Sequence, residues 1–85
     1  MTQPETERKV KEILARKLDR KVEEIHGDSR LAEDLGVDSF GTVEIMFDIE
    51  EAFSLQIPDT DIEPVRTVDD IVAYLQGWLD KQPKS

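Results

Sequence analysis

Cysteine is absent from this 85-residue sequence, which excludes disulfide bonds, thiolate catalysis and metal sites built on cysteine. The single histidine, His26, argues equally against a metal cluster of histidines. No apolar run approaches the roughly 18 residues of a membrane span, and residues 1–7 lack the apolar stretch of a signal peptide. We therefore expect a cytoplasmic protein without a metal site or membrane insertion, forming one domain over residues 1–85 with a frayed tail over 81–85.

Negative charge dominates the middle of the chain. The net charge is −9, but the segment from Asp28 to Asp70 alone carries −11, with Arg30 and Arg66 as its only bases. A field of this sign repels nucleic acid and anionic lipid and steers the protein toward basic surfaces. The same acids also keep a small protein in solution. The charge alone therefore does not distinguish binding to a basic partner from a role in solubility only.

Apolar periodicity predicts helices in this chain and no strand. Thr2 and Glu5 form a capping-box pair ahead of an apolar stripe, so a first helix is expected from near Thr2 to about Leu18. A long connection follows, and we expect it to be packed down by isolated apolar anchors, which are Val22, Ile25, Leu31, Leu35 and Val37.

Three further helices are expected after this connection. Asp38 is a suitable N-cap for a helix over residues 39–53. A short helix is expected to begin at Asp59, and Thr67 with Asp70 opens a last helix. We therefore predict an all-α fold, a small four-helix bundle with three longer helices, a short third helix and a long first loop.

The helix over residues 39–53 carries two apolar faces when its residues are placed about 100° apart. The first is the expected core face, made of Ile45, Met46, Ile49 and Phe53. The second, which we call the apolar ridge, is made of Phe40, Val43 and Phe47. Glu44 and Glu51 border the ridge on one side and Glu50 on the other, which is typical of a docking surface. The alternative is that Phe40 and Phe47 pack under the long loop or against the short helix.

Ser39 stands at the start of the same helix, within Leu35-Gly36-Val37-Asp38-Ser39. Gly36 permits a turn that a Cβ would oppose, and Asp38 caps the helix, so the Ser39 hydroxyl is expected to face solvent. A phosphodiester on that hydroxyl would lie near the positive pole of the helix, an interaction that contributes roughly 0.3–1 kcal/mol. An Asp-Ser pair is also common capping chemistry, so these residues alone assign no function.

Several segments together resemble the acyl carrier protein family, in order and without gaps. They are residues 35–39, then Thr42-Val43-Glu44, Ile49-Glu50-Glu51-Ala52-Phe53, Ile57-Pro58-Asp59 and Arg66-Thr67-Val68-Asp69-Asp70. The resemblance implies that Ser39 carries a covalent 4′-phosphopantetheine arm, which a phosphopantetheinyl transferase attaches from coenzyme A. It also implies that Asp38 corresponds to the acid that precedes the modified serine in the family. It also implies a monomeric, non-catalytic carrier that shuttles an acyl thioester between enzymes of a fatty acid, polyketide or related lipid pathway.

The resemblance further implies how partners are recognised. Glu44, Glu50 and Glu51 match acids that pair with arginine and lysine on the transferase and on the enzymes that load and process the acyl chain. The short helix resembles a mobile gate beside the acyl-binding core. The expected partner-binding set therefore joins these three acids to the ridge residues Phe40, Val43 and Phe47 and to Asp59, Asp61 and Glu63 of the short helix.

Two residues after the serine depart from the family, which most often has leucine and then an acid where this chain has Phe40 and Gly41. The change removes one acidic contact, enlarges the apolar one and marks a specialised carrier. Ser39-Phe40-Gly41-Thr42-Val43 also resembles aminoacyl and D-alanyl carriers, so an aminoacyl cargo is the alternative to an acyl one. An unmodified acidic helical adaptor for a basic partner is the alternative of a different class.

Overall fold

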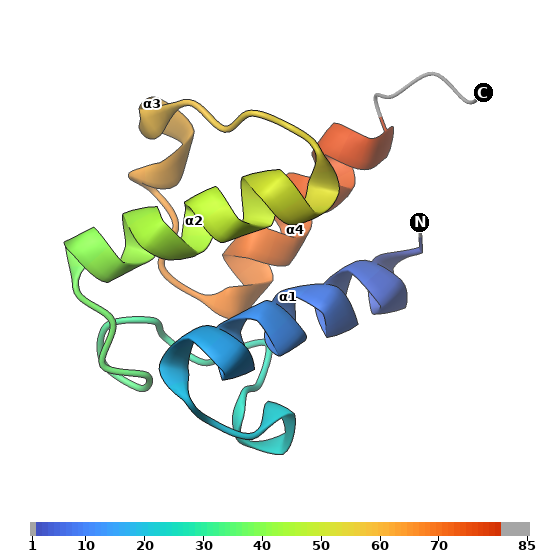
Figure 1. Ribbon diagram of the computed structural model, residues 1–85. Coiled ribbons are helices and arrows are strands. Elements are labelled where there is room, and N and C mark those ends of the chain that lie inside the picture. The colour runs from blue at the N-terminus through green and yellow to red at the C-terminus, as the bar shows by residue number, and fades with distance from the viewer. Residues whose placement is uncertain (1, 81–85) are drawn as a thin grey trace.

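The computed structural model describes residues 2–80, which form four α-helices and one short 3₁₀ turn but no strand (Figure 1). The elements are α1 (Gln3–Leu18), η1 (Val22–Glu24), α2 (Ser39–Phe53), α3 (Asp59–Ile62) and α4 (Val68–Asp80). The predicted all-α fold, with three longer helices and a short third one, is confirmed. The expected frayed tail, residues 81–85, lies outside the described residues. None of the helices within 2–80 is long and apolar enough to cross a bilayer.

Side-chain caps define where α1 and α4 begin. At α1, the Glu5 amide donates to Thr2 Oγ1 and the Thr2 amide donates to Glu5 Oε1, which forms the predicted capping box. At α4, Thr67 and Asp70 exchange two hydrogen bonds of 3.1 Å in the same manner. Each pair satisfies amide groups that have no acceptor within the helix, so these local pairs fix the helix starts.

The core lies between α1, α2 and α4. In Figure 1, α1 runs beside α2, and α1 also contacts α4. The predicted core face of α2 is buried, with Ile45, Met46 and Ile49 at most 1% exposed, and Phe53 is half-buried against it. The same cluster includes fully buried side chains from the other two helices, Val10, Leu14, Val68, Ile71 and Leu75. Each buried aliphatic side chain of this size contributes about 1.5–3 kcal/mol, so this interface holds the three helices together.

Apolar anchors and backbone pairing hold the long first loop against the helices. Four of the five predicted anchors are buried, namely Ile25, Leu31, Leu35 and Val37. The Leu31 amide donates to the Arg66 carbonyl across 2.9 Å, which joins the loop to the segment before α4. The prediction for Val22 is wrong, because this residue lies in the η1 turn at the surface, where it is 36% exposed.

Candidate functional site

Ser39 is the first residue of α2, and it is exposed. Asp38 caps the helix, with its Oδ1 accepting the Gly41 amide across 2.6 Å. No residue within 2–80 forms a hydrogen bond with the Ser39 hydroxyl. Because the carboxylate of Asp38 takes the capping role, the serine oxygen stays available for modification.

Two glycines shape the approach to Ser39. Gly36 has φ +69°, the left-handed region that a Cβ disfavours, as the sequence predicted. A Cβ at Gly41 would lie 3.1 Å from Val37 Cγ1 and 3.2 Å from Asp38 Oδ1, tighter than most van der Waals contacts. The glycine at position 41, where the family most often has an acid, therefore allows the loop to pack closely against the first turn of α2.

Ser39 borders a groove of about 760 Å³ between the first loop, α2 and α3, which we call the α2–α3 groove. Its apolar lining consists of Leu31, Ala32, Val37, Val43, Phe47, Ile62 and Val65. Five charged residues share the lining, and they are Glu33, Asp38, Asp59, Glu63 and Arg66. A concave apolar surface with charged groups around it suits a ligand that has an apolar body and a polar attachment point.

The apolar ridge is exposed on the surface of α2. Phe40 is 72% exposed, Val43 36% and Phe47 57%. The alternative in which Phe40 and Phe47 pack under the long loop or against the short helix is therefore wrong for Phe40. Val43 and Phe47 also line the α2–α3 groove, and Phe47 therefore joins the two surfaces. The rotation of α2 thus presents an apolar strip to solvent directly beside Ser39.

The acids that border the ridge differ in what they contact. Glu44 Oε2 lies 3.8 Å from Lys17 Nζ. Glu50 Oε1 accepts the amide of Ile57 across 3.1 Å and so supports the connection between α2 and α3. Glu51 is exposed, and its side chain forms no hydrogen bond or ion pair within residues 2–80. Of the three expected docking acids of α2, only Glu51 therefore has a carboxylate without a hydrogen bond or ion pair in this part of the chain.

The acids of the short helix also fall into two kinds. Asp59 and Glu63 are exposed and line the groove, whereas Asp61 Oδ2 accepts the hydroxyl hydrogen of Tyr74 across 2.6 Å. Burial, then the hydrogen bond to Asp61 and its negative charge, raise the pKa of Tyr74 to about 12. Sequence reasoning missed Tyr74, whose only signal was its position at the margin of the apolar stripe of α4.

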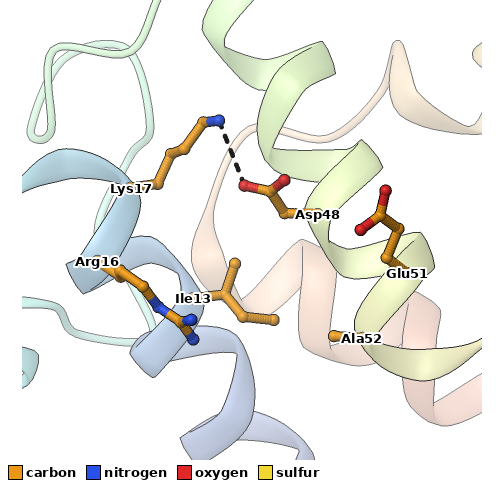
Figure 2. Close-up of a pocket in the computed structure, with 6 residues that line it drawn as sticks. All are labelled: Ile13, Arg16, Lys17, Asp48, Glu51 and Ala52. Atoms are coloured by element: carbon orange, nitrogen blue, oxygen red, sulfur yellow. Dashed lines mark ion pairs between the residues drawn. The ribbon is translucent and has the colours of Figure 1, made fainter.

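A second hollow, of about 540 Å³, lies between α1 and α2 (Figure 2). It is lined by Ile13, Arg16, Lys17, Asp48, Glu51 and Ala52, so cations come from α1 and acids from α2. Lys17 Nζ lies 3.3 Å from Asp48 Oδ2, as the dashed line in Figure 2 marks. Ser39 does not line this hollow. In the part of the chain that the structure describes, no group of three histidine or acidic residues is placed to hold a metal ion.

Comparison with known proteins identifies the family. Residues 8–75 match the family described as "Phosphopantetheine attachment site". Over 70 residues, the chain is 47% identical to an acyl carrier protein of Rickettsia bellii strain RML369-C, a match that covers 82% of this chain and 81% of the relative. It is also 47% identical over 70 residues to an acyl carrier protein of strain OSU 85-389, covering 82% and 86%. The fold and the comparisons define a phosphopantetheine-bearing carrier, and the chain belongs to the acyl carrier protein family.

Members of this family are non-catalytic carriers with a 4′-phosphopantetheine prosthetic group, and they interact with a phosphopantetheinyl transferase and with acyl-processing enzymes. The start of α2 fits that group. It offers an exposed hydroxyl at Ser39 without a hydrogen bond to residues 2–80, and the first-turn amides of a 15-residue helix favour the negative charge of a phosphodiester.

Proposed function

We propose that Ser39 is the attachment site of the 4′-phosphopantetheine arm and that the protein carries an acyl group between biosynthetic enzymes. The observation that carries this proposal is the exposed Ser39 hydroxyl, left without a hydrogen bond because its neighbour Asp38 caps α2. When bound, the group supplies a thiol that holds the acyl chain as a thioester and a reach that serves several active sites. The residues of the chain itself present the arm, shelter the cargo and dock the partners.

The α2–α3 groove supports an acyl cargo. Its apolar residues begin beside Ser39 and continue to Ile62 and Val65, so an apolar chain that enters the groove leaves water at about 0.8 kcal/mol per buried methylene. An aminoacyl cargo gains little from such walls, because its ammonium group loses hydration there. The groove thus favours the fatty acid, polyketide or related lipid pathway over the aminoacyl alternative.

The docking surface that we propose combines the apolar ridge with the acids around it. The ridge supplies Phe40, Val43 and Phe47, and the surrounding acids are Glu44, Glu50, Glu51, Asp59, Asp61 and Glu63. Exposed ion pairs contribute about 0.2–1 kcal/mol each, which gives fast, salt-sensitive and reversible association with basic enzyme surfaces. We expect the protein to act as a cytoplasmic monomer with a single domain.

Incubation with coenzyme A and a phosphopantetheinyl transferase of broad specificity tests the attachment site. The intact mass is expected to increase by one phosphopantetheine group, and Ser39→Ala is expected to abolish the increase. Ser54→Gly is the matched control, because Ser54 is an exposed serine at the other end of α2 whose φ of 55° glycine accepts readily. An unchanged mass of the wild-type protein would instead support the unmodified acidic adaptor.

A further inference from the structure

The last turn of α1 supplies a cation to the acidic flank of α2. Lys17 Nζ lies 3.3 Å from Asp48 Oδ2 and 3.8 Å from Glu44 Oε2, so one ammonium group faces two carboxylates. Figure 2 shows the Lys17 side chain reaching from α1 across the hollow to Asp48. The three side chains are 35–47% exposed, so a partner protein can reach each of them.

Lys17 forms ion pairs with Glu44 and Asp48 but not with Glu51. Glu44 and Glu51 lie seven residues apart, about two helical turns, and therefore border the ridge on the same side. Asp48 lies farther round the helix, toward α1. Lys17 thus approaches two of the three acids, and Glu51 is the one without an ion pair in the described chain.

We infer that Lys17 is a specificity-determining residue of the docking surface, because it competes with the basic groups of a partner for Glu44 and Asp48. Glu51 is then the principal docking carboxylate of α2. The partner is a basic surface patch of the phosphopantetheinyl transferase, seated on the apolar ridge of a chain whose net charge is −9. This inference rests on the proposed function, since it requires that basic enzymes dock on the ridge.

The competition follows from the chemistry of the contact. An arginine of the partner that approaches Glu44 either displaces Lys17 or shares the carboxylate with it, and both weaken the new pair. Exposed pairs of this kind alter an equilibrium by about twofold to fivefold. Glu51 has no such ion-pair partner among residues 2–80, so a basic group of the transferase can pair with it without displacing another cation.

Arg16 provides the matched control for Lys17. Both residues are basic, both belong to the last turn of α1 and both line the hollow, but Arg16 forms no ion pair within residues 2–80. Lys17→Gln and Arg16→Gln therefore change the net charge equally, and only Lys17→Gln frees Glu44 and Asp48. At low salt, Lys17→Gln is expected to bind the transferase about twofold to fivefold more tightly than Arg16→Gln. Equal dissociation constants for the two variants would overturn the inference, because net charge alone would then explain the change.

A second pair of variants examines the acids themselves. Glu51→Gln is expected to weaken binding to the transferase more than Glu44→Gln does, and the two effects should become more similar in the Lys17→Gln background. Equal effects of both substitutions in the wild-type background would also overturn the role of Lys17. If the wild-type protein binds the transferase with no dependence on salt, the proposed docking surface itself is wrong. Salt-dependent binding with equal effects of the two substitutions would instead contradict only the role of Lys17.

Discussion

Tyr74 donates its hydroxyl hydrogen to Asp61 Oδ2 across 2.6 Å, and this bond joins the middle of α4 to the short helix α3. The other anchor of α3 is Ile62, whose side chain is buried against the core. Since Ile62 also lines the α2–α3 groove, the bond between Tyr74 and Asp61 holds one wall of that groove in place.

Alkaline pH is expected to weaken the fold through Tyr74. The phenol ionises near pH 10 in the unfolded chain but near pH 12 in the folded one, so in this window the unfolded state releases its proton first. The stabilisation is complete below pH 10 and is lost as the pH rises toward 12. Urea unfolding of Tyr74→Phe, followed by circular dichroism, should show a smaller fall in the free energy of unfolding across this window than wild type. A fall of the same size in both proteins would contradict the raised pKa.

Glu50 and Glu51 are adjacent acids with different expected effects on stability. Glu50→Ala removes the acceptor of the Ile57 amide and is expected to cost about 1 kcal/mol in the free energy of unfolding. Glu51→Ala removes no side-chain hydrogen bond or ion pair within residues 2–80 and should remain within about 0.5 kcal/mol of wild type. Urea midpoints measure both values, and equal midpoints would show that the bond from Ile57 contributes nothing.

The cap of α4 is expected to stabilise the whole bundle. Thr67→Ala removes the oxygen that accepts the Asp70 amide and should lower the free energy of unfolding by about 1 kcal/mol. Thr60→Ala is the control, because Thr60 is an exposed threonine of α3 that makes no hydrogen bond through its side chain within the described residues. Thermal unfolding of the two variants compares them, and a similar loss from both would argue against a specific role for the cap.

Phe40 is expected to matter for association and not for folding. Its ring is 72% exposed, so Phe40→Leu should leave the free energy of unfolding within about 0.5 kcal/mol of wild type. Phe53→Leu makes the same substitution at the half-buried end of the core face and should destabilise the protein more. The docking role predicts that Phe40→Leu alone slows transfer of the phosphopantetheine group at unchanged stability. Unaltered transfer rates would remove Phe40 from the docking surface.

Local sequence signals predicted the helix starts well, because each depends on residues three positions apart. Thr2 with Glu5 and Thr67 with Asp70 form their caps from neighbouring side chains, whatever the rest of the chain does. The exposed ridge was predictable for a similar reason, since a regular helix separates Phe40 from the core face by rotation alone.

Contacts between helices were not predictable from spacing. The pair of Lys17 with Asp48 joins residues on different helices, and the bond of Tyr74 to Asp61 joins α4 to α3. Both depend on how the helices pack, which a periodic pattern does not encode. The error at Val22 has a local reason, because Val22 is the first residue of the three-residue η1 turn, none of whose residues is buried.

The shortness of α3 has a consequence for its motion. Four residues form little hydrogen-bond ladder of their own, so α3 depends on Ile62 and on the bond between Asp61 and Tyr74. We expect its amides to exchange with deuterated solvent through local opening, while the central amides of α4 exchange only when the bundle unfolds globally. One side of the groove is therefore expected to open on a faster timescale than the three longer helices, and under the proposed function this opening would let cargo enter or leave while the bundle stays folded.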